Sequence, residues 1–168
     1  MYLIFKILTI IIFFGFTFST IHANENPKFN IGYYDLENDI RYNEWGVHPV
    51  DIRSSTNKIY KKPVAGAELG LKDIKPFQRM AKLNFELITK SIKDRENIEE
   101  IIYNHILENN IKIILTDLPK NELLKVVNKI SDLNISIINI SEKDNSIRSE
   151  QCDKNLFHVI PSNRMLTD

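Results

Sequence analysis

Three aspartates that follow predicted strands are of the type used in phosphoryl transfer. Asp35 and Asp39 come after a predicted strand at 28–34, and Asp117 comes after another at 111–116. A phosphoacceptor receiver domain keeps its magnesium ligands and its phosphorylated aspartate at such positions. It also needs a lysine after the fifth strand to pair with the phosphate, but Pro161 and Ser162 stand there. We therefore expect these acids to make polar binding contacts and not to transfer phosphate.

Other chemistries that could use these residue types lack their required partners. A pyrophosphate-binding turn needs several glycines after the first strand, and only Gly32 is present. His105 and His158 have no metal-like spacing to another His, Cys or acid pair, so we expect structural roles for both. Cys152 is the only cysteine, which excludes an intrachain disulfide, and we expect a packed or idle side chain and not a nucleophile or ligand. The sequence therefore predicts no catalytic set, no metal site and no cofactor.

The remaining candidates lie mainly in a polar, turn-rich segment at 35–63. Loops longer than about 12 to 15 residues are usually functional or disordered, so Arg41, Tyr42 and Trp45 qualify as ligand contacts. The two aromatic residues could equally pack the loop onto the domain. Ser162 is suited to capping a following helix, although a cap at the carboxyl edge of a sheet can also face a ligand. The predicted contacts are Asp35, Asp39, Arg41, Tyr42, Trp45, Asp117 and Ser162.

Alternating strands and helices are expected to position these side chains. The hydrophobic periods predict strands at 28–34, 83–88, 111–116, 135–140 and 156–160, and helices at 64–74, 96–109, 119–133 and from Asn163 onward. Helical connections of this length indicate right-handed crossovers and a parallel sheet covered on both faces. The predicted class is α/β, doubly wound, with strand order 2-1-3-4-5. Ligands bind beyond the carboxyl ends of such strands.

The first 23 residues are typical of an export signal. Lys6 precedes an apolar run from Ile7 to Phe18, and Ala23 is a suitable residue before a cleavage point. A membrane span needs roughly 20 apolar residues, and this run is shorter. We expect cleavage near Ala23, export to the periplasm, and one domain at 24–168.

Charge suggests no polyanionic partner. Lys6 is the only charged residue of the leader, so its removal leaves a formal charge of about −1. Neither nucleic acid nor an anionic membrane is indicated by this balance. The small basic run of Lys58, Lys61 and Lys62 is predicted to lie in a solvated loop.

Four groups of residues together carry a resemblance to a known family. They are Ile31–Tyr33 through Asp39–Tyr42, Pro63–Ala67, Leu115–Pro119, and Cys152–His158 with Pro161–Leu166. These segments resemble the type I periplasmic binding proteins, the solute receptors of ABC importers, and more narrowly the receptor-like family found with pyrroloquinoline quinone-dependent alcohol oxidation systems. The resemblance implies a two-lobed protein that closes on a small solute at a hinge and presents it to a membrane permease, and this chain would cover about the first lobe.

Two alternative functions stay open at this point. One is a periplasmic partner protein that docks onto a quinoprotein alcohol dehydrogenase or its electron acceptor and has no transport role. The other is a small secreted hydrolase, for which the sequence shows no nucleophile motif. The resemblance favours the non-catalytic solute receptor and implies a connection with alcohol or aldehyde catabolism.

Overall fold

Five strands form one parallel sheet. The computed structural model describes residues 26–42, 62–93 and 97–167. The strand order is β2-β1-β3-β4-β5, and every neighbouring pair is parallel. This confirms the predicted α/β class and the order 2-1-3-4-5. The strands are β1 (Lys28–Leu36), β2 (Asn84–Ile92), β3 (Ile113–Asp117), β4 (Ser136–Asn139) and β5 (Leu156–His158).

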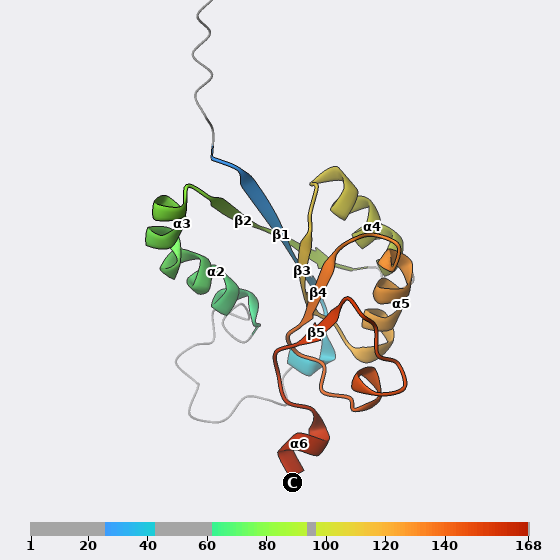
Figure 1. The fold of residues 1–168 in the computed structure, drawn as a ribbon. Helices are drawn as coiled ribbons and strands as arrows, with labels where there is room; N and C mark the ends of the chain where they lie inside the picture. Colours follow the sequence, from blue (N-terminus) through green and yellow to red (C-terminus); the bar gives the residue numbers. More distant parts are fainter. Residues whose placement is uncertain (1–25, 43–61, 94–96, 168) are drawn as a thin grey trace, which may run out of the picture.

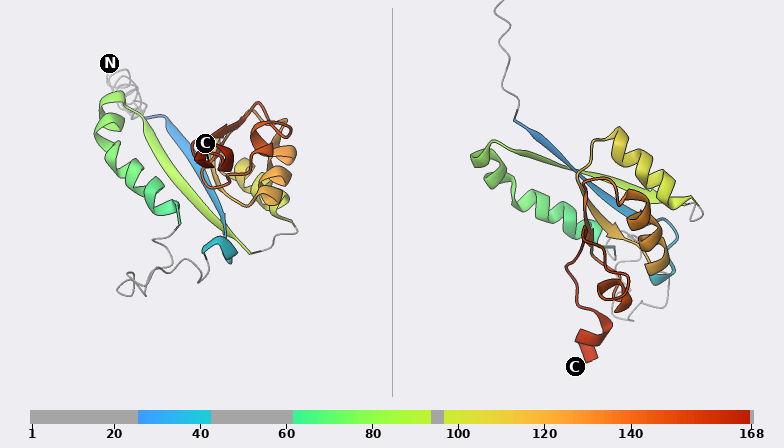
Figure 2. Two further views of the ribbon diagram at one scale, coloured as in Figure 1. Left: turned by 90° about the horizontal axis from the view of Figure 1, so that it is seen from below. Right: turned by 45° about the vertical axis from the view of Figure 1, so that its right-hand side comes forward.

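Helices flank both faces of this sheet. Figure 1 and Figure 2 show α4 and α5 together on one face, whereas α2 and α3 lie on the other face beside β2. None of the helices in the described ranges is long and apolar enough to cross a bilayer. The helices are α2 (Val64–Asp73), α3 (Lys75–Ala81), α4 (Ile98–Glu108), α5 (Lys120–Ile130) and α6 (Asn163–Thr167), with 3-10 turns η1 (Ile40–Tyr42) and η4 (Ser146–Arg148).

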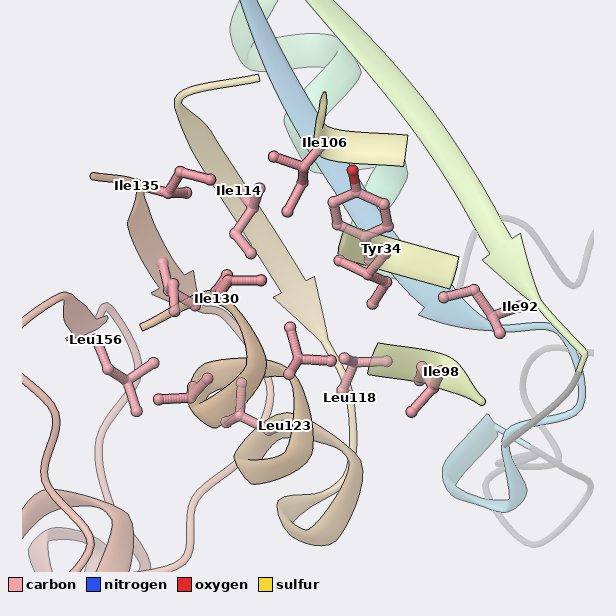
Figure 3. Packing of buried hydrophobic residues seen from close by; sticks show 14 of the residues in the cluster. Tyr34, Ile92, Ile98, Ile106, Ile114, Leu118, Leu123, Ile130, Ile135 and Leu156 are labelled. Atoms are coloured by element: carbon pink, nitrogen blue, oxygen red, sulfur yellow. The ribbon is translucent and has the colours of Figure 1, made fainter. Parts of the chain in front are cut away.

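The main core lies between the sheet and the pair α4 and α5. Ile98, Ile102 and Ile106 recur every four residues, so they occupy one face of α4, and all three are buried. Figure 3 shows side chains from α4 and α5 meeting apolar residues of the strands, including Ile114. Full burial of one such side chain stabilises the fold by roughly 1.5 to 3 kcal/mol. The helical period at 96–109 therefore predicted the covered face correctly.

Two regions differ most from the sequence prediction. The helix predicted at 64–74 is followed directly by a second helix, α3, in which Pro76 is the second residue, where a missing N–H costs nothing. β2 was expected to end at Ile88, but it continues to Ile92. The extra residues include Thr89 and Ser91, which obscured the apolar alternation. A strand at the edge of a sheet tolerates such polar positions.

Candidate functional site

The carboxyl ends of β1 and β3 bring the predicted acids together. Asp35 and Asp117 are direct partners in the parallel ladder between these strands, so their side chains share one face. The chain then turns through η1, which lies beside the strand ends (Figure 1) and contributes Arg41 and Tyr42. Asp39 immediately precedes this turn. Four of the five residues thus form one connected group at the predicted edge, and Asp35 lies next to it.

Arg41 connects the acids to each other. Its Nε lies 3.1 and 2.9 Å from the two carboxylate oxygens of Asp39, and its Nη2 lies 2.6 Å from Asp39 Oδ2. The same Nη2 donates to Asp117 Oδ1 at 3.1 Å and to the Asp117 carbonyl at 3.0 Å. Such fork-shaped pairing is geometrically specific and stronger than a neutral hydrogen bond. One guanidinium therefore neutralises much of the charge of two carboxylates.

Arg41 is also the charged member of this group that reaches solvent. The side chains of Asp39 and Asp117 are 1% and 0% exposed, whereas that of Arg41 is 27% exposed. Burial alone lowers the pKa of Arg41, but its hydrogen bonds to Asp39 and the charge of Asp117 outweigh this effect and raise the pKa. Its Nη1 points to Ser141, whose Oγ lies 2.9 Å away. Within this network, the charged group accessible to solvent is therefore the Arg41 guanidinium.

Two tyrosines complete the surroundings of Asp117. Tyr33 donates its hydroxyl to Asp117 Oδ2 at 3.2 Å, and Tyr42 donates to Oδ1 at 2.9 Å. Burial, followed by the charge of Asp117, raises the pKa of both tyrosines. Both hydroxyls therefore stay protonated and act as donors. Asp117 accepts four hydrogen bonds, counting the contact at its carbonyl, and is a fixed structural acceptor.

Asp35 is paired with a residue that the sequence did not indicate. Lys62 Nζ lies 2.7 Å from Asp35 Oδ2 and 2.8 Å from the Leu36 carbonyl, and the Lys62 side chain is 15% exposed. Ser91 donates to the other carboxylate oxygen of Asp35. The predicted solvated loop is therefore wrong for Lys62, because this lysine compensates a buried carboxylate. Lys58 and Lys61 lie outside the described residues.

Ser162 caps a helix and does not join the Arg41 network. Its Oγ accepts the N–H of Met165 at 3.3 Å, at the beginning of α6, and the residue is buried. This is the capping geometry that the sequence offered as one of two interpretations. Trp45, the other predicted contact from the polar segment, lies outside the described residues.

The loop after β4 is held by Asn139, a residue that sequence reasoning missed. Asn139 is fully buried, and its Oδ1 accepts the N–H groups of Ser141 at 3.2 Å and Glu142 at 2.9 Å. Its Nδ2 donates to the Glu142 carbonyl at 2.7 Å. This side chain holds the loop so that Ser141 faces Arg41. The sequence feature that could have identified Asn139 is its position as a polar residue at the end of a buried strand.

The polar side chains at this edge are suited to binding through hydrogen bonds in fixed positions. Among the described residues, no three His, Cys, Asp or Glu side chains are placed to hold a metal ion. His105 Nδ1 lies 3.0 Å from the Tyr34 hydroxyl, and His158 Nδ1 lies 3.0 Å from Asn139 Nδ2, so one ring nitrogen of each imidazole has a structural partner. Cys152 is exposed. The edge offers donors and acceptors in fixed positions, with Arg41 open to solvent.

The fold is similar to part of a solved solute receptor. The branched-chain amino acid transporter substrate binding protein LivJ from Streptococcus pneumoniae, solved in complex with isoleucine, matches with a TM-score of 0.60 at 13% identity. The match covers 80% of this chain and 34% of that chain. This chain therefore has the α/β architecture of a partial type I periplasmic binding protein fold, and it spans about a third of the length of that receptor.

Two other solved proteins match with lower scores. One is a solute binding protein of an ABC transporter from Rhodopseudomonas palustris in complex with 3,4-dihydroxy benzoic acid, with a TM-score of 0.49, 12% identity, and coverage of 80% of this chain and 32% of that chain. The other is an ABC transporter solute binding protein from Burkholderia multivorans, with a TM-score of 0.37, 19% identity, and coverage of 78% and 39%. No protein-family model and no curated protein matches the sequence.

Proposed function

We propose that this chain is the first lobe of an exported solute-binding component of an ABC-type importer, and that it is not an enzyme. The supporting observation is the prebuilt network at the carboxyl edge of β1 and β3, in which Arg41 is held by Asp39 and Asp117 while 27% of its side chain faces solvent. Ligands of open α/β sheets bind at this edge. Closure on the solute by a second lobe and delivery to a permease belong to the same proposal.

The solute is proposed to contact Arg41, Tyr42 and Ser141 directly. Asp35, Asp39 and Asp117 were expected to touch it, but all three are buried and already accept hydrogen bonds from the protein. Their proposed role is to orient the open donors. A binding site needs only a few such fixed polar groups beside apolar walls.

A thermal-shift panel tests this proposal on the exported protein. The panel contains alcohols, aldehydes, short carboxylic acids and amino acids, because a ligand that binds only the folded state raises the melting temperature. For any stabilising solute, we expect Arg41→Lys to weaken binding about tenfold or more, since it loses the planar fork. Lys125→Gln, an exposed change on α5, is the matched control. Unchanged affinity in Arg41→Lys would contradict contact at this edge.

The same panel separates the narrower predictions. Stabilisation by an alcohol or aldehyde supports the association with pyrroloquinoline quinone-dependent catabolism, which stays a prediction from the sequence resemblance. A periplasmic partner of a quinoprotein dehydrogenase would instead bind that enzyme and gain no stability from any of these solutes. Co-sedimentation with the dehydrogenase measures that alternative directly.

A further inference from the structure

The side-chain amide of Asn139, at the end of β4, has its orientation fixed by the loop that follows. Its Oδ1 accepts the N–H groups of Ser141 and Glu142, so Nδ2 must be the donor. One hydrogen of Nδ2 reaches the Glu142 carbonyl at 2.7 Å, and the other faces Nδ1 of His158 in the neighbouring strand β5 at 3.0 Å. His158 therefore accepts through Nδ1, and the proton of its neutral ring is on Nε2.

The contact between Asn139 and His158 is incompatible with a protonated ring. Both nitrogens of an imidazolium are donors, so Nδ1–H of His158 would face an N–H of Asn139. A rotation of the ring by 180° would also remove the acceptor. Either response leaves one amide hydrogen of a fully buried side chain without its acceptor, which costs free energy.

The charges around His158 oppose its protonation. Burial, followed by the positive charge of Arg148 in η4, lowers the pKa of His158, and the backbone of Ile147 acts in the opposite direction. The loop after β4 contains the acids Glu142 and Asp144, whose carboxylates each accept a backbone N–H at 2.8 Å. The charged side chain that acts on the imidazole is therefore Arg148, and it favours the neutral ring.

The segment that Asn139 holds is short and reaches the candidate site. The backbone is bound to other elements on either side of it: the N–H of Ile140 is bound to β3, and the carbonyl of Lys143 accepts an N–H from α6. Between these two points, the Asn139 side chain fixes the backbone. Ser141 lies in this segment, and its Oγ is 2.9 Å from Arg41 Nη1. A change at Asn139 therefore reaches Arg41 through one residue.

We propose that His158 is a pH-sensitive positioning residue for the loop of Ser141, and that its protonation releases this loop from Arg41. The neutral ring keeps the Asn139 amide in place, whereas the imidazolium does not. Because the pKa of His158 is lowered, release occurs below the ordinary histidine value of about 6.5. Contact of a solute with Ser141 rests on the proposed function, in which acid would then weaken capture.

Nuclear magnetic resonance of the solute-free exported protein tests this proposal between about pH 8 and about pH 5. Long-range proton–nitrogen spectra should show the proton of the neutral His158 ring on Nε2. The backbone amide signals of Ser141 and Glu142 should shift with the same midpoint as the His158 ring, and so should the Arg41 Nε–H signal. Protection of the two amides, corrected for the intrinsic pH dependence of hydrogen exchange, should fall about tenfold, as expected for the loss of one hydrogen bond.

Three variants separate His158 from the other titrating groups. His158→Asn offers an Oδ1 acceptor in place of Nδ1 and does not titrate, so the Ser141 signal should stay near its neutral position. His105→Gln removes the other half-buried imidazole and should leave the wild-type titration unchanged. Glu142→Gln removes the carboxylate of the loop but keeps an oxygen for the Asp144 N–H, and it should preserve the midpoint.

Two results would overturn the proposal. One is a proton on Nδ1 of the neutral His158 ring, which the wild type alone can show. The other is a Ser141 amide signal that titrates in His158→Asn as it does in the wild type. Either result would leave solute contact at Arg41 intact. Conversely, a thermal-shift panel without a stabilising solute would contradict the proposed function but not the pH response of this loop.

Discussion

Arg41 stands between two carboxylates that have little access to water. Asp39 and Asp117 are 2% and 0% exposed, and each is bound by the Arg41 Nη2 group. Burying a carboxylate is costly unless a counter-charge and hydrogen bonds compensate it. The same guanidinium therefore serves stability and, in the proposed function, solute recognition. A substitution of Arg41 can therefore change both stability and solute binding. The free energy of unfolding and the affinity for solute must be measured separately.

Replacing Arg41 by Gln should destabilise the fold by about 3 kcal/mol. Removing one partner of a buried ion pair leaves the other charge uncompensated, and here two carboxylates are left. Urea denaturation of the wild type and the variant measures the difference. Arg164→Gln, whose exposed side chain forms no ion pair within the described residues, should change stability by less than about 0.5 kcal/mol.

A double-mutant cycle identifies the source of this loss. Asp39→Asn combined with Arg41→Gln should cost less than the sum of the single changes, because the second substitution removes a charge that the first left unpaired. Strict additivity would show that Asp39 and Arg41 do not stabilise each other.

The two half-buried imidazoles should make the protein less stable in acid. Burial, followed by the charge of Lys90, lowers the pKa of His105, and burial, followed by the charge of Arg148, lowers the pKa of His158. Between each lowered pKa and the unfolded value of about 6.5, the unfolded state binds more protons. The histidine contribution is thus fully present above about pH 6.5 and is lost as the pH falls through the folded-state pKa.

Urea denaturation between about pH 8 and pH 5 measures this dependence. His105→Gln should reduce the slope of the unfolding free energy against pH by an amount equivalent to less than one bound proton. The amide oxygen of the Gln side chain can still accept a hydrogen bond from Tyr34. His158→Gln should remove a separate part of the slope. A wild-type curve that has the same slope as both variants would contradict a lowered pKa at either histidine.

At the scale of elements, the close packing of β1 depends on one glycine. A Cβ placed on Gly32 would lie 2.7 Å from Cε2 of Tyr34, whose ring is fully buried and whose hydroxyl lies beside His105. Gly32→Ala should therefore cost about 1 to 3 kcal/mol, as overpacking of a core does. Chemical denaturation measures this loss.

Gly66 provides the opposite case within the same chain. A Cβ there meets no atom within 4 Å, and the residue lies inside α2. Gly66→Ala should stabilise the protein by about 0.5 to 1 kcal/mol because alanine favours the helix. If both glycine substitutions changed stability in the same direction, the contact with the Tyr34 ring would not be the cause.

The elements were predictable where their hydrophobic period is strong. The spacing of Ile98, Ile102 and Ile106 predicted the buried face of α4, and short apolar runs between helices predicted the parallel order. α3 was missed because Pro76 suggests interruption when it is read without the turn that precedes it. A local hydrophobic pattern can predict that a helix exists. Whether a proline interrupts that helix or occupies its first turn depends on where the helix begins, which the pattern does not show.

The site was predictable only in part, for a related reason. Strand ends identified Asp35 and Asp117, and topology then made them neighbours. The contact of Lys62 with Asp35 joins residues 27 positions apart, and no short-range pattern encodes it. Ser141 was likewise invisible as a partner of Arg41, which lies 100 positions earlier. Long-range polar pairs require the folded backbone before they can be recognised.

At the scale of the whole molecule, the two faces of the sheet are covered unequally. α4 and α5 bury one face in a continuous core, while α2 and α3 lie beside β2 on the other (Figure 2). On that second face, Leu115, Ile138 and Phe157 are successive partners across β3, β4 and β5. Phe157 is 53% exposed, and Val159, two residues further on, is 65% exposed. These four residues form an apolar strip.

This apolar strip should bind an apolar dye and promote self-association of the chain. Exposed contiguous apolar surface is unfavourable in water, and a short edge strand such as β5 offers it little cover. Phe157→Ser with Val159→Ser should reduce the fluorescence of bound anilinonaphthalene sulfonate and shift sedimentation toward the monomer. Both side chains are already largely exposed, so stability should change by no more than about 1 kcal/mol.

Leu107→Ser is the control for this last prediction, because Leu107 is 54% exposed on α4, away from the strip. It removes a similar apolar area from the surface but leaves Phe157 and Val159 in place. We expect dye binding and sedimentation to stay at wild-type values. If Leu107→Ser lowered both signals as much as the double variant, general surface hydrophobicity would explain them. A selective response to Phe157 and Val159 would instead locate the cohesive surface on the exposed apolar strip at β5.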